Sequence, residues 1–167
     1  RDRVQQLYPD VVFVGEIYGS VGELQTYVSQ GAMDANFDFP YMHALRQSLQ
    51  DSYAEPFRQI LFDQEARANE LSAGTRIVLA GNHDVTRLAS LWDDPSDRQR
   101  LAAFMTLMNI HTPLLYYGEE IGMTGVVKRP DDVSDEEYVR TINAFAWDGR
   151  SAQVGFRAEP VEGAAEN

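Results

Sequence analysis

The stretch Arg76-Ile77-Val78-Leu79-Ala80-Gly81-Asn82-His83-Asp84 joins a short apolar run to a glycine and three polar side chains. An apolar run of this length that ends at a turn former predicts a buried β-strand, here Arg76–Ala80. Three other runs have the same character, and we expect strands at Val11–Ile17, Ala35–Phe39 and Leu114–Tyr117. The chain is therefore predicted to contain four short, buried strands.

Patterns typical of helices separate these strands. Ser96 and Gln99 match a capping box, and the apolar residues that follow recur at spacings of three and four: Leu101, Phe104, Met105 and Met108. Tyr41–Gln50 and Glu55–Asn69 are also expected to be helical, with Pro56 in the first turn of the second helix.

The order of elements predicts the fold class. A second capping box, Ser134 with Glu137, places another helix after the fourth strand. Strands that alternate with helices favour a parallel sheet with crossover helices, so the fold class is α/β. Four strand–helix units make half of a closed (β/α)8 barrel, or TIM barrel, which typically takes about 250 residues. We expect residues 1–158 to form this half-barrel and Glu159–Asn167 to be a flexible tail.

The composition is that of a globular domain and excludes two classes of partner. The 167 residues include 26 acidic and 14 basic ones, with a formal net charge of −12, and the basic residues are scattered. Neither nucleic acid nor an anionic membrane surface is therefore an expected partner. No apolar run approaches the roughly 18 residues of a membrane-spanning helix. Cysteine is absent, which excludes disulfides and thiolate metal sites but leaves the compartment open.

Glu16 is the only charged residue in the run Val11–Ile17 and stands near its end. It could simply be a strand-end carboxylate that points into solvent. In parallel α/β folds, however, the carboxyl ends of the strands face the active site, where a partly apolar pocket can adapt a carboxyl group to general acid catalysis. Position favours the functional interpretation.

A second polar cluster, Asn82, His83 and Asp84 with Arg87, follows the strand Arg76–Ala80. Asp84 could instead be a helix cap and His83 a packed loop residue. Glu16 and Asp84 are 68 residues apart, about two βα units of roughly 30 residues each, so they could converge across a barrel mouth. Converging carboxylates suit the hydrolysis of glycosidic bonds.

Other polar and aromatic residues at the strand ends are candidates for the same mouth. Tyr117 could line a sugar pocket, and Tyr116 could do so or belong to the core. Asp34, Asn36 and Asp38 alternate along the second strand, so they share one face of it, and at least one is expected to face the mouth. His43 and His111 have no partners at metal-ligand spacing and are interpreted as packed histidines.

With these residues in place, the chain resembles the second half of the catalytic barrel of the α-amylase family of glycoside hydrolases. Val12-Phe13-Val14-Gly15-Glu16 is similar to the fifth strand with its acid/base glutamate. Asn82-His83-Asp84 with Arg87 is similar to the turn after the seventh strand, and Thr112–Met123 to the eighth strand and its loop. The resemblance runs from about Tyr8 to Asp148 and implies that strands five to eight are present.

The resemblance also implies roles. Glu16 would protonate the departing glycosidic oxygen and then activate water, and Asp84 would bind the distorted sugar and stabilise the oxocarbenium-like transition state. His83 would donate a hydrogen bond to the sugar, while Asn82 and Arg87 would orient the loop. The expected partner is an α-glucan or α-glucoside oligosaccharide. No cofactor is expected; calcium occurs in the family, but no metal site is evident in this sequence.

Two departures from the family pattern stand out. The nucleophile of the family is an aspartate after the fourth strand, in a Gly-Phe-Arg-x-Asp type motif that this chain lacks. Because retention needs that carboxylate about 5 Å from the acid, we expect the isolated chain to be inactive without the missing half of the barrel. In the stretch Ile142–Asp148, only Trp147 and Asp148 match the Arg-x-Pro-Met-x-Trp pattern of the family, which casts doubt on substrate contacts there.

Two alternative functions compete with a glycosidase. Gly81-Asn82-His83-Asp84 after a strand is also similar to the metal-binding turn of calcineurin-like metallophosphoesterases, but the further ligands of a two-metal site are missing. An amylase-like scaffold used only for binding is the other alternative. The presence of Glu16, His83 and Asp84 together argues against it.

Overall fold

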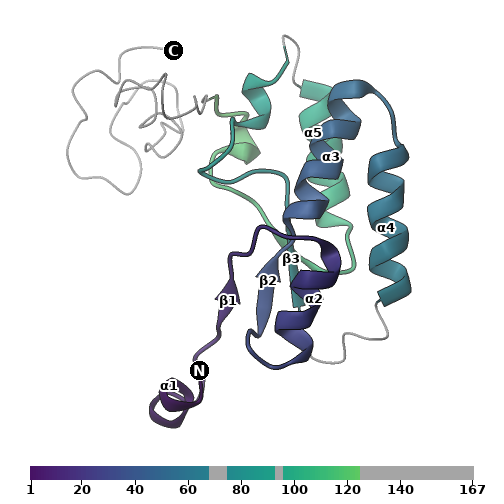
Figure 1. Cartoon of the computed structure of the whole chain (residues 1–167). Coiled ribbons are helices and arrows are strands. Elements are labelled where there is room, and N and C mark those ends of the chain that lie inside the picture. Colours follow the sequence, from purple (N-terminus) through teal and green to yellow (C-terminus); the bar gives the residue numbers. More distant parts are fainter. Residues whose placement is uncertain (68–74, 93–95, 125–167) are drawn as a thin grey trace, which may run out of the picture. The chain divides into compact units, whose positions relative to one another are not determined.

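The computed structural model describes residues 1–67, 75–92 and 96–124 (Figure 1). In chain order the elements are α1 (Asp2–Leu7), β1 (Val14–Gly15), α2 (Val21–Ser29), β2 (Ala35–Phe37), α3 (Phe39–Asp51), α4 (Glu55–Arg67), β3 (Thr75–Leu79), the 3-10 turn η1 (Leu88–Ser90), α5 (Ser96–Leu107), β4 (Thr112–Leu114) and the 3-10 turn η2 (Glu119–Ile121). The helix predicted after Ser134 and the tail Glu159–Asn167 lie outside the described residues.

The chain divides into two compact units, which we describe separately. The first contains Arg1–Ala80 and Arg100–Leu115, and the second contains Gly81–Gln99 and the residues from Tyr116 onward. Within the described ranges, no helix has the length and apolarity needed to cross a membrane.

All four strands lie in the first unit and form one sheet in the order β1-β2-β3-β4, with every neighbouring pair parallel. In the register of the sheet, Gly15 lies opposite Asn36, and Asn36 lies opposite Arg76. Each strand thus lies beside the strand that precedes it in the chain, so the strand order follows the sequence without reversal. A doubly wound sheet would instead reverse its strand order part-way. The predicted α/β class with a parallel sheet is confirmed.

β3 is shifted by one residue from its predicted bounds, whereas β2 and β4 differ from theirs at a helix cap and before a turn. β2 ends at Phe37 because Asp38 caps the next helix, where its side chain accepts a hydrogen bond from the Tyr41 N–H at 3.0 Å. β4 covers Thr112–Leu114 and not Leu114–Tyr117. Beyond it, Gly118 adopts a left-handed φ of 85° and begins η2, a conformation that glycine reaches without strain.

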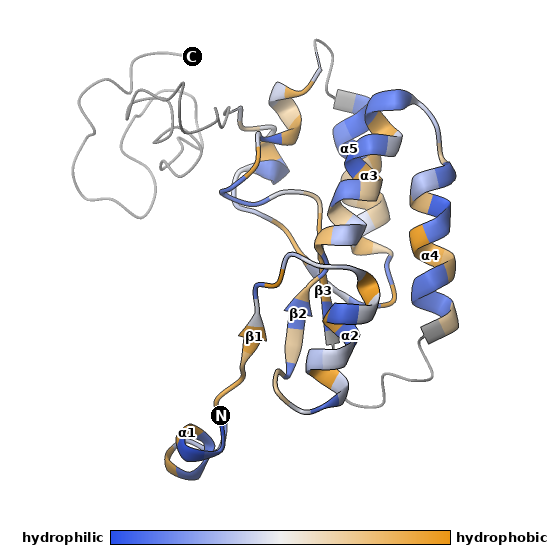
Figure 2. Ribbon diagram, in the orientation of Figure 1, coloured by the Kyte–Doolittle hydropathy of each residue, from blue (hydrophilic) through white to orange (hydrophobic). Residues whose placement is uncertain are grey.

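β1 is much shorter than predicted and forms one edge of the described sheet. It spans only two residues, although the apolar run around it is longer. Val12 and Val14 are exposed, which explains why the hydrophobic colour of β1 in Figure 2 marks a surface and not a core. The prediction of a buried strand at Val11–Ile17 is therefore wrong in length and in burial.

The core lies where α3 packs against both β3 and α4, as Figure 1 shows for α3 and α4. The Tyr41 ring meets the Phe57 ring edge-on, with the ring centroids 5.2 Å apart. Other core side chains of the first unit that are at most 2% exposed are Leu24, Phe39, Met42, Leu45, Val78, Leu79, Ala80 and Ala102. The helices predicted at Tyr41–Gln50 and Glu55–Asn69 are confirmed as α3 and α4. The described part of α4 ends at Arg67.

The predicted helix after Ser96 is confirmed as α5, but its predicted apolar face is wrong. Ala102 and Thr106 are buried, whereas Leu101, Phe104 and Met108 are 48%, 56% and 69% exposed. Ser96 itself belongs to the helix, and the Gln99 side-chain amide donates to the Glu119 carbonyl oxygen at 2.9 Å. The buried face of α5 is therefore formed by Ala102 and Thr106 and not by the larger apolar residues.

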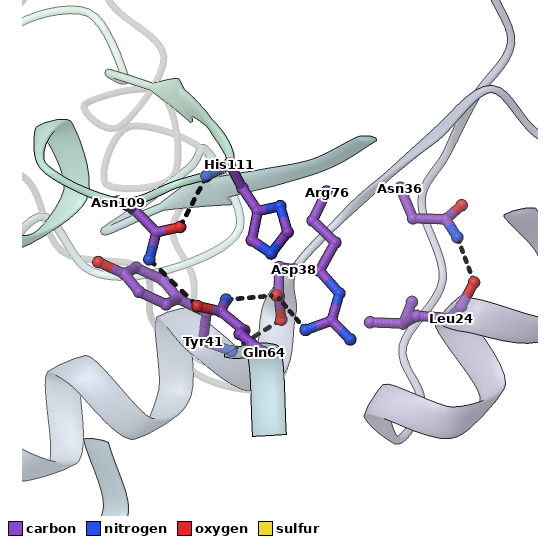
Figure 3. Close-up of polar contacts among 8 residues, drawn as sticks. All are labelled: Leu24, Asn36, Asp38, Tyr41, Gln64, Arg76, Asn109 and His111. Carbon is purple, nitrogen blue, oxygen red and sulfur yellow. Dashed lines mark hydrogen bonds and ion pairs between the residues drawn. The ribbon is translucent and has the colours of Figure 1, made fainter. Parts of the chain in front are cut away.

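A network of buried polar side chains joins the layers of the first unit (Figure 3). The fully buried Asp38 carboxylate lies 3.3 Å from an Arg76 guanidinium nitrogen and accepts a hydrogen bond from the Gln64 amide at 3.0 Å. Gln64 in turn accepts from the Asn109 amide at 3.1 Å, and the Asn109 oxygen accepts from the His111 backbone N–H at 3.0 Å. One network thus links β2, β3, α4 and the segment before β4.

The two histidines that the sequence places in the core differ in the structure. The Nε2 atom of His111 is buried, so the prediction of a packed histidine is confirmed there. His43 lies on the exposed side of α3, and its prediction is wrong. The residues on either side of His43, Met42 and Ala44, face the core instead.

Removing the Asp38 carboxylate should unfold the first unit at a much lower denaturant concentration. Asp38→Ala leaves the Arg76 charge buried without its partner, which typically costs about 3–5 kcal/mol. Urea unfolding of the 167-residue chain, followed by far-UV circular dichroism, measures the loss. Glu55→Ala is the matched control because it breaks the exposed pair with Arg58, and its midpoint should stay that of the wild type. Equal midpoints for the two variants would contradict a structural role for the buried pair.

Acid should destabilise the protein through His111. Burial, and then the Arg76 charge, lower the pKa of His111 from its ordinary 6.5, while Asp38 opposes them. The unfolded chain therefore binds this proton more readily, so the free energy of unfolding falls as the pH drops below the unfolded pKa. Unfolding free energies between about pH 7.5 and pH 5.5 test this. His111→Gln should flatten the dependence, and an unchanged slope would contradict the assignment.

Candidate active site

Glu16 lies directly after β1, at the carboxyl end of the parallel sheet. Its side chain is exposed, as are those of Val12, Val14 and Tyr18, whereas Gly15 between them is buried. This alternation is that of a strand and places Glu16 on the same face as the two valines. The structure therefore puts Glu16 at the end of the sheet where the sequence predicts it.

The segment between Glu16 and α2 is held by two local contacts. The Tyr18 ring stacks on Phe39, with centroids 4.1 Å apart and planes within 5°. Ser20 caps α2 in a complete capping box, in which Glu23 accepts a hydrogen bond from the Ser20 N–H at 2.7 Å. Hydrogen bonds from the backbone and the side chain of Ser20 lower the pKa of the Glu23 carboxyl. The chain that leaves Glu16 is thus fixed at its middle and at its end.

The polar residues of β2 do not face a mouth, contrary to the prediction. Asn36 and Asp38 are 1% and 0% exposed. Asn36 donates to the Leu24 carbonyl oxygen at 2.7 Å, and Asp38 belongs to the buried network. Asp34 precedes the strand, where it accepts a hydrogen bond from the Phe13 N–H at 2.8 Å and pairs with Arg1. Asn36 and Asp38 hold the fold together, because buried polar atoms need partners within the protein, whereas Asp34 is partly exposed.

In the second unit, Asn82, His83 and Asp84 form a compact polar turn. The Asp84 N–H donates to the Asn82 side-chain oxygen at 3.1 Å, and His83 Nε2 lies 3.3 Å from an Asp84 oxygen. The His83 and Asp84 side chains are 50% and 38% exposed. An imidazole and a carboxylate held side by side and open to solvent can hydrogen-bond neighbouring hydroxyl groups of one ligand.

Arg87 lies buried behind two tyrosines in the same unit. It is 2% exposed, its guanidinium carbon lies 4.6 Å and 4.8 Å from the ring centroids of Tyr116 and Tyr117, and it donates to the Tyr117 carbonyl oxygen at 2.7 Å. Burial raises the pKa of Tyr116, and so does its neighbour Tyr117. Arg87 therefore acts from below the surface, where it fixes Tyr117, and does not itself reach a ligand in solvent.

Two close contacts at glycines are not predicted from the sequence. A Cβ atom on Gly118 would lie 2.7 Å from the Met123 sulfur and 3.1 Å from an Arg87 guanidinium nitrogen, and one on Gly15 would lie 2.0 Å from the Asn36 side-chain oxygen. Each glycine adjoins a predicted site residue, Tyr117 or Glu16. A glycine next to a predicted site residue could have indicated both contacts, because glycine often marks a point where another group approaches the backbone closely.

The structure brings some predicted residues together and leaves one relation open. Asn82, His83 and Asp84 form one cluster, and Arg87 and Tyr117 form another, whereas Glu16 belongs to the first unit. The convergence of Glu16 and Asp84 stays a prediction. Among residues 1–67, 75–92 and 96–124, no group of three or more histidine and acidic side chains is placed to hold a metal ion.

Comparison with known families identifies the family of the chain. Residues 1–154 match the family model of the alpha amylase catalytic domain. The chain belongs to the α-amylase family. The parallel sheet, in chain order with Glu16 at its carboxyl end, agrees with membership in this family.

The α-amylase relatives are much longer than this chain. Alpha-amylase 3 of Dictyoglomus thermophilum is 28% identical over 145 residues, which is 86% of this chain and 27% of that protein. The glucan 1,6-alpha-glucosidase of Streptococcus dysgalactiae subsp. equisimilis is 27% identical over 147 residues, or 80% of this chain and 27% of that protein. Both alignments cover only about a quarter of the relative.

Solved structures of the family share the fold. The alpha-amylase from H. orenii superimposes with a TM-score of 0.70 at 23% identity, over 87% of this chain and 29% of that one. The alpha-amylase from Geobacillus thermoleovorans, solved in complex with acarbose, gives a TM-score of 0.64 at 23% identity, over 84% of this chain and 34% of that one. At this identity, the similarity establishes the fold, an α/β arrangement of the TIM-barrel type.

A change at Arg87 should loosen the second unit more than the same change at Arg98. Arg87→Lys removes the planar group that contacts both tyrosine rings and the hydrogen bond to the Tyr117 carbonyl oxygen, and should cost about 2 kcal/mol. Arg98 also faces an aromatic ring, that of Trp92 at 5.3 Å, but is only half-buried, so Arg98→Lys is the control. Thermal unfolding and near-UV circular dichroism of the tyrosines measure the difference. Equal effects would contradict the buried role of Arg87.

Proposed function

We propose that the chain supplies strands five to eight of the (β/α)8 barrel of a retaining glycoside hydrolase that acts on α-glucosidic bonds. The observation that carries the proposal is the position of Glu16 directly after β1, the first strand of a parallel sheet in chain order, in a chain of the α-amylase family. Active sites of such barrels lie at the carboxyl ends of the strands.

In this proposal Glu16 is the general acid and base. Its carboxyl group gives a proton to the departing glycosidic oxygen, and the resulting carboxylate then takes a proton from the water that releases the sugar. The exposed position of Glu16 supports this role, because the donor must reach a bound oligosaccharide.

The second unit supplies the contacts to the sugar. Asp84 would stabilise the positive charge that develops on the sugar ring, and His83 would donate a hydrogen bond to a hydroxyl of the same sugar. Asn82 accepts the Asp84 N–H and so fixes the turn. Arg87 would hold Tyr117 against the substrate, since its guanidinium binds the Tyr117 carbonyl oxygen.

The covalent step requires a carboxylate that we place outside residues 1–167. The nucleophile attacks the anomeric carbon while Glu16 protonates the leaving oxygen, and water then cleaves the glycosyl intermediate. The 167-residue chain should thus be inactive until it is joined to the preceding half of the barrel. The names of the relatives support an α-glucan or α-glucoside as substrate, and structure neighbours were solved with acarbose and with maltose.

Replacing Glu16 should affect poor leaving groups most. The test uses a chimaera in which residues 1–154 of this chain replace the matching part of a related α-amylase. In this chimaera, Glu16→Gln removes proton donation and should lower turnover about 10²-fold or more on a maltooligosaccharide. An aryl glucoside with an acidic phenol needs little protonation and should lose much less. Steady-state kinetics on both substrates measure the contrast.

Glu23→Gln is the matched control for this experiment. It changes a carboxylate in the same loop region, and glutamine can serve in a capping box, so turnover on both substrates should stay that of the parent chimaera. Equal losses on the two substrates in Glu16→Gln would refute proton donation by Glu16.

A further inference from the structure

The side chain of Asn36 touches the chain on both sides of Glu16. Asn36 lies opposite Gly15 in the parallel pairing of β1 and β2 and is 1% exposed. Its amide nitrogen donates to the Leu24 carbonyl oxygen at 2.7 Å, in the helix that follows Glu16 (Figure 3). One buried amide therefore contacts the residue before Glu16 and the helix after it.

The amide oxygen of Asn36 faces Gly15. A Cβ atom on Gly15 would lie 2.0 Å from it, a distance that no side chain could occupy without displacing the backbone or the amide. This oxygen is buried and accepts no hydrogen bond from the described residues. A buried acceptor without a donor is costly and rare in native proteins. The contact between the Asn36 side-chain oxygen and Gly15 limits how closely the end of β1 can approach β2.

The strand itself gives Glu16 little support. β1 pairs over only two residues and forms an edge of the described sheet, so few ladder hydrogen bonds fix its carboxyl end. The segment from Glu16 to Ser20 is held instead by contacts at its two ends and at Tyr18. Asn36 contacts Gly15 before the segment, and Phe39 stacks on Tyr18. After the segment, the capping box of Ser20 begins α2, and Asn36 donates to Leu24 in that helix. Asn36 makes two of these contacts.

We propose that Asn36 is a positioning residue for the acid/base: its amide sets the Gly15–Glu16 backbone and thereby the direction in which the Glu16 carboxyl group points. The proposal rests on the proposed function of Glu16. General acid catalysis needs the carboxyl oxygen within hydrogen-bond reach of the leaving oxygen, and a shift of about 1 Å can cost about 10²-fold in rate. Asn36 does not touch the substrate and acts only through Glu16.

The test compares Asn36→Ala with Asn109→Ala in the catalytically competent chimaera. Asn109 is the control because its side-chain amide is also hydrogen-bonded within the first unit, to Gln64 and to the His111 backbone N–H, but contacts neither Gly15 nor α2. Both variants are assayed at a temperature at which circular dichroism shows them fully folded. Asn36→Ala should lower kcat by about 10- to 100-fold on maltooligosaccharide with KM within about twofold, and Asn109→Ala should leave both constants unchanged.

Two further readouts separate positioning from stability. The loss in Asn36→Ala should be larger on maltooligosaccharide than on an activated aryl glucoside, as expected for a misdirected acid. The basic limb of the pH profile of kcat/KM should also shift, because the environment of the Glu16 carboxyl changes. If Asn36→Ala does not fold, Asn36→Asp keeps the shape of the side chain, loses the donor to Leu24, and should show the same leaving-group dependence.

The glycine side of the contact gives an independent check. Gly15→Ala should lower kcat because its Cβ meets the Asn36 oxygen, whereas Gly22→Ala, whose Cβ would meet nothing within 4 Å, should not. If both substitutions act through this one contact, the double variant Gly15→Ala/Asn36→Ala should lose less kcat than the product of the two single fold-losses.

Each outcome separates this inference from the proposed function. If Glu16→Gln loses turnover on poor leaving groups but Asn36→Ala keeps the kcat and pH profile of the parent, only the positioning role is overturned. The same holds if Asn36→Ala and Asn109→Ala lose kcat equally on both substrates. If Glu16→Gln itself keeps full turnover, the proposed function fails.

Discussion

The buried carboxylate of Asp38 is the interaction on which the first unit depends. Asp38 ends β2 and caps α3, and the same group binds Arg76 on β3 and Gln64 on α4. A buried charge is tolerated only when its lone pairs are satisfied, so all these partners must reach it together. The position of two helices relative to two strands follows from that requirement, and the apolar contacts of α3 with β3 and α4 fill the space that remains.

Several large apolar side chains of the first unit are exposed. Val14 on the edge strand β1 and Val12 before it, and Leu101 and Phe104 on α5 with Met108 directly after it, are all large apolar side chains open to solvent. Apolar exposure on this scale usually marks an interface. A half-barrel that packs against its other half would cover such surfaces, which fits the proposal that the chain supplies strands five to eight.

The two parts of the candidate site use the same device. A glycine lets the backbone approach a buried polar side chain, which then fixes the functional residue next to that glycine. Gly15 approaches Asn36 beside Glu16, and Gly118 approaches Arg87 beside Tyr117. Glu16 is exposed, whereas Tyr117 is partly buried and also contacts the Tyr116 ring. Because the supporting side chains are buried, they direct the site without meeting the ligand.

The sequence by itself determined the α/β class, the four parallel strands, the helices α3, α4 and α5, and the family, because periodicity, capping residues and short motifs are local in the chain. It also placed Glu16 at a strand end and grouped Asn82, His83 and Asp84. It could not show that Asn36 and Asp38 face the helices, that α5 buries Ala102 and Thr106 in place of its larger residues, or that β4 begins at Thr112. Only the tertiary structure decided these points, because the face that a strand or helix buries depends on partners distant in the sequence, and a local pattern does not specify those partners.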